Sequence, residues 1–498
     1  MPELKPVSSR EDMTKFWEEH ATKTTTVEMM LDEEAELLGQ EEVPEILGLL
    51  PDLKGKRVLE LGSGIGRFTG KLAEQSKSVV AVEFMESFHK ENQKTNGKFN
   101  NVIFKCDDAT KIEFEKESFD VIFMNWLLMY LDDAEVNALF KKFLSWLPEN
   151  GCLFFRESCF HKSGNKGRTF NPTIYRTPAD YVALVDFTQI ENPENNTVSR
   201  FDIIFSRSIQ AYIKLKNNAN QICWLYHKVS SICQNAENGH TNFQQFLDKQ
   251  QYSTNGILRY EKIFGRHFVS TGGIETTKEF VEMLNLKPKE TVLDVGCGIG
   301  GSAFLMAQEY DASVIGMDLS SNMINIALER SAEFNDSRVQ FEVADATKRE
   351  YAPESFDVVY SRDTILHIED KLSLFKNFLK FLKPGGRLLI SDYCCTPDEW
   401  SENYAAYVKQ RGYRLHSVAN YGKLIEKAGF VNVKAMDRTN QFKDVLEKEL
   451  ERTKSIKDEY IKEFSAQDYQ DIINGWQDKL QRVAQGDQKW GLFYAEKA

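Results

Sequence analysis

The chain has 498 residues, too many for a single hydrophobic core, so we expect two domains of roughly 250 residues each. With 42% hydrophobic and 28% charged residues, it has the composition of a soluble globular protein. The formal net charge of −13 argues against a nucleic-acid partner, because such a partner requires a clustered basic surface.

Two further classes of protein are disfavoured. The longest apolar run, 121–131, is too short to cross a bilayer, and the charged N-terminus lacks the apolar stretch of a signal peptide. We therefore expect a cytoplasmic protein without membrane insertion. The eight cysteines contain no C-x-x-C pair, which gives zinc binding little support.

An internal repeat organises the chain. Residues 58–66 read V-L-E-L-G-S-G-I-G, and 292–300 read V-L-D-V-G-C-G-I-G. Further landmarks recur in the same order, including D-A-T at 108–110 and 345–347 and S-F-D-V at 118–121 and 355–358. This repetition predicts a duplicated domain. We place the first copy at 1–230, a polar linker at 231–245 and the second copy at 246–498.

Short apolar runs alternate with amphipathic stretches inside each copy. Residues 322–330, for example, place Met323, Ile326 and Ala327 on one helical face. Such alternation predicts an α/β fold with a doubly wound, mostly parallel sheet and helices on both faces. Residues 201–212 and 430–436 are predicted to be late strands that close the two sheets.

A glycine-rich turn follows the first strand of each copy. Glycines let a ligand approach the backbone at the carboxyl edge of the sheet, where open α/β folds bind their ligands. Each copy also carries three acids, one before the turn, one ending the second strand and one after the third. A dehydrogenase remains the alternative, because it shares the second acid and a related turn.

This combination resembles the class I S-adenosylmethionine-dependent methyltransferases over both halves. The resemblance implies two tandem Rossmann-like domains, each with a seven-stranded sheet containing one antiparallel strand. It also implies S-adenosyl-L-methionine as methyl donor and S-adenosyl-L-homocysteine as product. The implied cofactor contacts are Glu60, Gly62, Gly64, Gly66, Glu83 and Asp108 in the first half, and Asp294, Gly296, Gly298, Asp318 and Asp345 in the second.

The second half contains a candidate base. Residues 360–368 read Y-S-R-D-T-I-L-H-I directly after the predicted fourth strand. Asp363 and His367 would share one face of a helix beginning there, and an Asp oriented against a His can remove the proton of an amine. The alternative is a helix-capping Asp and a structural His.

Tyrosine, arginine and lysine side chains gather around this motif in the sequence. Hydroxyl donors, a guanidinium and an ammonium are suited to a phosphate monoester. Tyrosine faces also suit a nitrogen that becomes cationic as it gains methyl groups.

Three stretches resemble the phosphoethanolamine N-methyltransferases in their tandem form: I-F-G-x-x-x-x-S-x-G-G, S-R-D-x-I-L-H and D-E-W…Y-V-K-Q-R-G-Y. The resemblance implies that Asp363 and His367 are the catalytic pair and that Tyr252 closes the site. It assigns Ser270 and Arg362 to the cofactor. It assigns to the substrate phosphate Tyr260, Tyr393, Tyr407, Arg411, Tyr413 and Lys479, the last on the nearby Gly-Trp alone.

The first half has a different motif at the same place. Trp126 stands where the second half has Asp363, and Tyr130 stands where it has His367. Either this half only binds cofactor, or it catalyses a related step with another proton acceptor. The stretches N-W-L-L-M-Y-L, F-F-R-E-S-C-F-H and N-P-T-x-Y-R resemble the first half of the tandem enzymes, in which the first domain adds one methyl and the second adds two, giving phosphocholine. The implied first-site residues are Tyr130 for catalysis and Tyr175, Arg176 and Tyr181 for phosphate, with 16–20 and 26–30 as a lid.

Two rival functions remain at this point: methylation of another small acceptor, and a single active domain with the other as a regulatory cofactor-binding module. A small phospho-amine is the expected partner, and no metal is required because the leaving thioether is neutral. The sequence does not determine the oligomeric state, for which a monomer is the expectation.

Overall fold

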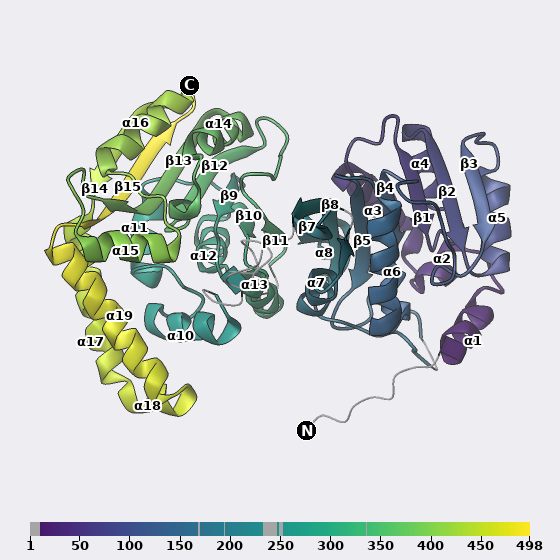
Figure 1. Cartoon of the computed structure of the whole chain (residues 1–498), viewed down its shortest axis with the longest axis horizontal. Coiled ribbons are helices and arrows are strands. Elements are labelled where there is room, and N and C mark those ends of the chain that lie inside the picture. The colour runs from purple at the N-terminus through teal and green to yellow at the C-terminus, as the bar shows by residue number, and fades with distance from the viewer. Residues whose placement is uncertain (1–9, 168–169, 194, 233–246, 249–251, 335) are drawn as a thin grey trace. The chain divides into compact units, whose positions relative to one another are not determined.

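The computed structural model describes residues 10–498 except 168–169, 194, 233–246, 249–251 and 335. It divides into two compact units, Met1–Gly239 and His240–Ala498 (Figure 1). The predicted linker at 231–245 lies almost entirely outside the described residues, and its first two positions belong to a strand.

The first unit is built on a sheet with strand order β7-β8-β5-β4-β1-β2-β3. Strands β5 to β3 run parallel, and β8 runs antiparallel to both of its neighbours. A short strand, β6, pairs with β7 and was not predicted. The strands are β1 (Arg57–Leu61), β2 (Ser78–Glu83), β3 (Val102–Cys106), β4 (Val121–Asn125), β5 (Cys152–Ser158), β6 (Gln189–Asn192), β7 (Thr197–Ser208) and β8 (Gln221–Ile232).

The second unit repeats this order as β14-β15-β13-β12-β9-β10-β11, with β15 antiparallel to β13 and β14. The predicted doubly wound, mostly parallel fold with one reversed strand is therefore confirmed in both halves. The strands are β9 (Thr291–Val295), β10 (Ser313–Asp318), β11 (Val339–Ala344), β12 (Phe356–Arg362), β13 (Leu382–Cys395), β14 (Val431–Asp437) and β15 (Gln488–Glu496).

The predicted late strands are only partly correct. The prediction at 430–436 corresponds to β14, but the one at 201–212 continues too far. Strand β7 ends at Ser208, and a helix, α8 (Gln210–Lys216), begins two residues later. Because the first four residues of α8 are buried, the apolar run continues across the strand–helix boundary and hides it.

Helices cover both faces of each sheet (Figure 1). Those of the first unit are α1 (Arg10–His20), α2 (Thr26–Met30), α3 (Ala35–Leu49), α4 (Thr69–Gln75), α5 (Glu86–Asn96), α6 (Asp133–Trp146), α7 (Pro178–Asp186) and α8. Those of the second are α10 (Thr254–Phe264), α11 (Gly273–Glu282), α12 (Gly301–Tyr310), α13 (Ser321–Phe334), α14 (Lys371–Phe381), α15 (Glu402–Arg411), α16 (Val418–Ala428), α17 (Thr439–Ser455), α18 (Lys457–Glu463) and α19 (Ala466–Ala484). No described helix is long and apolar enough to span a bilayer.

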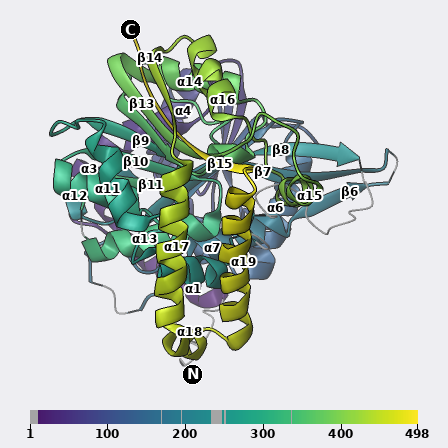
Figure 2. The same cartoon turned by 90° about the vertical axis from the view of Figure 1, so that its left-hand side faces the viewer.

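The units differ most between their last two strands. The first unit has only α8 there, whereas the second has α17, α18 and α19. Helices α17 and α19 lie side by side and are joined at one end by α18 (Figure 2). This inserted helical segment contributes to the second site, as described below.

Helix α6 shows how the sequence sets a packed element. Asp132 accepts a hydrogen bond from the backbone of Glu135, whose side chain accepts one from the Asp132 backbone, so the helix begins at a capping box. Val136, Phe140 and Phe143 follow at helical spacing and are buried. This pattern fixes α6 as a core helix of the first unit.

The core under α6 depends on stacked aromatic rings. Phe155 of β5 has no exposed surface, and its ring centroid lies 4.9 Å from that of Trp224. We predict that Phe155→Ala lowers the free energy of unfolding of the first unit by about 3–5 kcal/mol, because a large buried side chain leaves a cavity. Urea unfolding of the full chain measures this loss. Phe187, which is 79% exposed, is the control: Phe187→Ala should change the value by less than about 0.5 kcal/mol, and equal losses would contradict the assignment of the core.

Candidate active sites at the carboxyl ends of the strands

The two glycine-rich turns have the same backbone conformation. Their φ angles are +69°, +55° and +88° at Gly62, Gly64 and Gly66, and +75°, +55° and +93° at Gly296, Gly298 and Gly300. A Cβ on Gly64 would lie 2.6 Å from Met29 Sδ, and one on Gly298 would lie 2.6 Å from Val269 Cγ2. Glycine is therefore required at the middle position both by conformation and by space.

The acids at the ends of β2 and β10 are fixed in the same way. Glu83 accepts backbone hydrogen bonds from Gly64 and Met85, both at 2.8 Å. Asp318 accepts them from Gly298 at 3.0 Å and Ser320 at 2.9 Å. Burial raises the pKa of both carboxyls, that of Asp318 to about 6. Each acid lies directly beside its glycine turn, where the sequence predicted it.

The acids before the turns are wholly buried, and desolvation raises the pKa of both Glu60 and Asp294 to about 8. Glu60 accepts a hydrogen bond of 2.6 Å from the Thr69 hydroxyl. The Oδ2 atom of Asp294 is buried and has no hydrogen-bond partner among the described residues. A buried oxygen of this kind needs a donor, which a ligand amino group in this pocket would supply.

The third acids sit in matching turns after β3 and β11. Asp108 accepts hydrogen bonds from the amide and hydroxyl of Thr110, and Asp345 accepts the same pair from Thr347. In the first unit, Arg10 of α1 also donates to Asp108 at 2.6 Å. Desolvation raises the pKa of Asp108, but the hydrogen bonds from Arg10 and Thr110 outweigh it, so the net pKa is lowered.

The first unit contains a cleft of about 1320 Å³ including its open mouth. Tyr130, Tyr175 and Trp126 line it beside the glycine turn, and α1 and α2 supply a second wall. The ring of Trp17 in α1 meets that of Tyr130 edge-on, with centroids 5.3 Å apart. The predicted lid segments therefore border the cleft.

In the second unit, Asp363 and His367 are not on an α-helix. Asp363 has a φ of +49°, and His367 ends a 3₁₀ turn, Ile365–His367. Asp363 Oδ1 accepts hydrogen bonds from Trp490 Nε1 at 2.8 Å and Ser391 Oγ at 3.3 Å. Its Oδ2 is buried and has no hydrogen-bond partner among the residues described. Asp363 is thus held by side chains from the sheet, with one oxygen available to a ligand.

His367 is neutral in this environment. Desolvation lowers the pKa of its imidazole to about 4, and the positive charges of Arg411 and Lys371 add to the effect. The ring lies edge-on to that of Tyr413, with centroids 5.1 Å apart. A neutral imidazole has a lone pair that can accept a hydrogen bond from an ammonium, and a bound phosphate anion would oppose the two cations that keep its basicity low.

Basic and phenolic groups gather beside this pair. Tyr252, Tyr260, Tyr407 and Tyr413 all lie within electrostatic range of Arg411. The ring of Tyr413 is 5.8 Å from that of Tyr407 and 6.5 Å from that of Tyr393. We call Tyr252, Tyr260, Tyr393, Tyr407, Arg411, Tyr413 and Lys479 the phenol–cation cluster.

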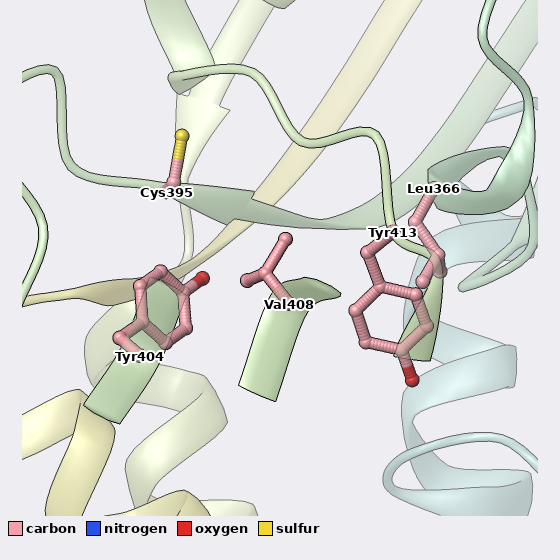
Figure 3. Packing of buried hydrophobic residues seen from close by; sticks show 5 residues of the cluster. All are labelled: Leu366, Cys395, Tyr404, Val408 and Tyr413. Carbon is pink, nitrogen blue, oxygen red and sulfur yellow. The ribbon is translucent and has the colours of Figure 1, made fainter. Parts of the chain in front are cut away.

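A small core holds the cluster in place. Tyr404 and Val408 of α15 pack with Leu366 and Cys395, and Tyr413 completes this core (Figure 3). Tyr393 and Tyr407 pack against it from outside. The spacing of Tyr404 and Val408 anchors α15, which ends at Arg411 and so places that guanidinium in the cluster.

Lys479 reaches the cluster from α19. Its ammonium lies 4.3 Å from the centroid of the Trp476 ring. Desolvation lowers the pKa of Lys479 to about 8, opposed by the negative charges of Glu449 and Asp363 and assisted by Arg411 and Arg482. Lys479 is therefore protonated at neutral pH and lies within range of both Arg411 and Asp363.

Comparisons with known proteins identify the family of this chain. Two family models described as "Methyltransferase domain" match residues 58–151 and 286–455. Phosphoethanolamine N-methyltransferase 3 of Arabidopsis thaliana is 51% identical over 490 residues, which are 98% of each chain. Phosphoethanolamine N-methyltransferase 1 of Zea mays is 52% identical over 493 residues, 99% of this chain and 97% of the relative.

The chain belongs to the phosphoethanolamine N-methyltransferase family. The solved structure of phosphoethanolamine N-methyltransferase 2 from Haemonchus contortus, in complex with phosphomonomethylethanolamine and S-adenosylhomocysteine, superimposes with a TM-score of 0.76. It is 27% identical and covers 92% of this chain and 99% of its own. The predicted resemblance and the tandem fold are confirmed.

Two of the predicted first-site residues do not line the cleft of this methyltransferase. Arg176 is 4% exposed and donates to the carbonyls of Leu128 and Leu131 at 2.9 and 2.8 Å. Tyr181 has no exposed surface and packs 5.1 Å from the ring of Trp224. Neither side chain lines the cleft, so the fold gives no support to a phosphate-binding role for either. A polar loop in the sequence gives no sign of which of its residues turn inward.

Arg176 instead helps to hold the turn that carries Tyr130. Glu157, which the sequence did not single out, accepts hydrogen bonds from the amides of Leu127, Leu128 and Met129 at the other end of that turn, Leu128–Tyr130. Burial raises the pKa of Glu157 to about 7. The turn is therefore clamped at both ends.

The second unit clamps its equivalent turn with other residues. Lys371 donates to the carbonyls of Ile365 and Ile368 at 2.7 and 2.6 Å. Asp392 occupies the place of Glu157 and accepts a hydrogen bond from Tyr421 at 3.0 Å. Burial lowers the pKa of Lys371 and raises that of Asp392.

The inserted helices contribute a residue that only the fold reveals. Glu449 of α17 accepts hydrogen bonds from the Gly272 amide at 2.7 Å and from Trp476 Nε1 at 2.9 Å. It therefore ties the loop that follows Ser270 to α19. No sequence pattern connects positions so far apart.

Arg362 also binds the loop that follows Ser270. It is 5% exposed, donates to the Thr277 hydroxyl at 2.7 Å and also binds the Thr271 carbonyl. Ser270 immediately precedes Thr271, whose carbonyl Arg362 binds. The fold thus supports a role for Arg362 in placing Ser270, and direct contact of either residue with the cofactor stays a prediction. The described residues contain no group of three or more His, Cys, Asp or Glu side chains arranged to hold a metal ion.

Proposed function

We propose that this chain transfers methyl groups from S-adenosyl-L-methionine to the nitrogen of phosphoethanolamine, in successive steps that end in phosphocholine. One observation carries the proposal. A carboxylate oxygen with no hydrogen-bond partner in the described part of the chain and a neutral imidazole lie next to the phenol–cation cluster. Such a site offers a proton acceptor for an amine at one end and cations for a phosphate at the other.

Both units have features that suit the methyl donor. The glycine turns leave backbone exposed, Glu83 and Asp318 lie where ribose hydroxyls could donate to them, and the buried Oδ2 of Asp294 suits the amino group of the donor. Bound S-adenosylmethionine would supply an electrophilic methyl group on a sulfonium. The protein must therefore present a bare nitrogen lone pair in line with that methyl.

The second unit has residues for each requirement. Arg411, Lys479 and the surrounding hydroxyls would hold the phosphate, which leaves the ammonium end facing Asp363 Oδ2. Asp363 would orient the ammonium, His367 would accept its proton, and Tyr252 would close the site. This role is supported by the packing of Tyr252 against a buried cluster that includes Ile299 of the glycine turn.

The first unit would carry out the first methylation. Its cleft has the same turn conformation and retains Tyr130 and Tyr175. A phenol at the place of His367 gives this unit a different polar group beside the acceptor, which suits a different step of the sequence. We infer that the second unit adds the second and third methyl groups, and that phosphocholine then serves phosphatidylcholine synthesis in the cytoplasm.

Two rival functions make different use of these residues. An apolar acceptor would gain nothing from the phenol–cation cluster. A purely regulatory first unit would not need a cleft extending past the cofactor turn to Tyr130 and Tyr175.

The reaction itself is the first test. With labelled S-adenosylmethionine, we expect label in the mono-, di- and trimethylated forms of phosphoethanolamine, and at least about a hundredfold lower kcat/KM with free ethanolamine, which lacks the charged group that the cluster recognises. Chromatography of the labelled products measures both. Equal rates on the two amines would refute the phosphate site.

Reciprocal variants test the division between the units. We predict that Asp363→Ala slows the second and third methylations by about 10²–10⁴-fold and leaves the first unchanged, because only the second site loses its carboxylate. Tyr130→Phe should slow the first methylation and leave the second and third unchanged. Each step is followed with its own acceptor in the full chain. Survival of all three steps in Asp363→Ala would remove this residue from the mechanism.

The pKa of Lys479 predicts a pH dependence. The pKa is lowered to about 8, so the cation is present below that pH and is lost as the pH rises through it. We expect the affinity of the second site for phosphomonomethylethanolamine to fall about tenfold from pH 7 to pH 9, measured by calorimetry. Lys479→Met should bind weakly at both values and lose this dependence. If Lys479→Met kept it, Lys371, whose pKa is also lowered to about 8, would be the responsible group.

A further inference from the structure

The catalytic carboxylate of the second unit depends on a tryptophan from the last strand. Trp490 of β15 donates its indole N–H to Asp363 Oδ1 at 2.8 Å. Trp490 has no exposed surface, and its ring packs against those of Phe280 and Phe442, with both centroids 5.5 Å away. A large ring that is fully buried in a packed core cannot turn freely, so the direction of the N–H is fixed.

The first unit contains a similar hydrogen bond in which the indole donor stands at the position of Asp363 and the acceptor at the position of Trp490. Trp126 and Asp363 occupy the same place: each follows its strand at a positive φ, and its amide donates to the neighbouring strand at 2.8 Å, to Arg156 and Ser391 respectively. Trp126 Nε1 donates to Gln221 Oε1, also at 2.8 Å.

Strand register shows that Gln221 and Trp490 are equivalent positions. Gln221 pairs with Ser158 on β5, and Trp490 pairs with Tyr393 on β13. Ser158 lies two residues beyond Arg156, whose carbonyl accepts the hydrogen bond of the Trp126 amide. Tyr393 likewise lies two residues beyond Ser391, whose carbonyl accepts that of the Asp363 amide. An indole N–H therefore joins the same two positions in both units. The indole is on the turn after the fourth strand in the first unit (Trp126) and on the last strand in the second (Trp490).

The exchange changes the charge presented to an amine. In the second unit, the indole occupies Asp363 Oδ1 and leaves Oδ2 without a partner among the described residues. In the first unit, the indole of Trp126 replaces the carboxylate. The Arg156 guanidinium lies 3.7 Å from the centroid of the Trp126 ring. An ammonium therefore meets an anion at this place only in the second unit.

We propose that Trp490 is a positioning residue that aims Asp363 at the substrate nitrogen, and that the exchange of donor and acceptor sets the different amine chemistry of the two units. This inference rests on the proposed function and deepens it. Trp490 touches neither substrate nor cofactor in this scheme. It acts by holding one carboxylate oxygen so that the other faces the nitrogen.

The test uses the full chain with phosphomonomethylethanolamine as acceptor. Trp490→Phe keeps a packed ring but removes the N–H. We expect kcat to fall roughly ten- to hundredfold, the range for a lost hydrogen bond to a charged group, while KM for the acceptor changes less than about threefold because the phosphate ligands are intact. Trp490→His, which restores a ring N–H, should recover most of the lost rate.

A second measurement separates positioning from general damage. In an Asp363→Ala background, Trp490→Phe should cause no further loss, because the group that it positions is already gone. Trp224→Phe is the matched control: its indole N–H has no hydrogen-bond partner among the described residues, so removing it should leave this step unchanged. If Trp490→Phe does not fold, Trp490→Met, which also lacks the ring N–H, replaces it in both backgrounds.

Three results would overturn the inference: an unchanged kcat in Trp490→Phe, no recovery in Trp490→His, or additive losses with Asp363→Ala. Failure of the proposed function would be distinct, because the unmodified chain would then not methylate the acceptor at all.

Discussion

The sites of both units depend on one backbone hydrogen bond. The amide after the fourth parallel strand donates to a carbonyl of the fifth, from Trp126 to Arg156 and from Asp363 to Ser391. Both donors have a positive φ, a conformation that non-glycine residues adopt only under tertiary constraint. The turn brings each side chain to the sheet edge where the glycine loop also ends. Cofactor and acceptor groups therefore meet at one edge.

Charged groups buried under each turn keep this geometry in place. Glu157 and Arg176 bind opposite ends of the turn in the first unit, and Lys371 binds the carbonyls of the turn in the second. Buried charges are costly unless hydrogen bonds satisfy them, and here the free amides and carbonyls of a short turn provide those bonds. Because these hydrogen bonds make each turn rigid, the side chains of Tyr130 and His367 are held in fixed directions.

The units diverged by changing what covers a common sheet edge. In the first, α1 reaches the third acid through Arg10 and the cleft through Trp17. In the second, α17 to α19 supply Glu449, Trp476 and Lys479 between the last two strands. The same cofactor turn thus lies beside different side chains in the two units, with Trp17 and Tyr130 in the first and the phenol–cation cluster in the second.

The sequence by itself determined the duplication, the fold class, both glycine turns and the three acids of each unit, because these features are local and recur in register. Short motifs also singled out Asp363, His367 and Arg411 as candidate site residues, and their roles stay predictions. Only the tertiary structure decided that Arg176 and Tyr181 turn inward, that α8 replaces the end of a predicted strand, and that Trp490 binds Asp363 from 127 residues away. The physical reason is that side-chain direction and long-range pairing follow from packing around the whole sheet, which no local pattern encodes.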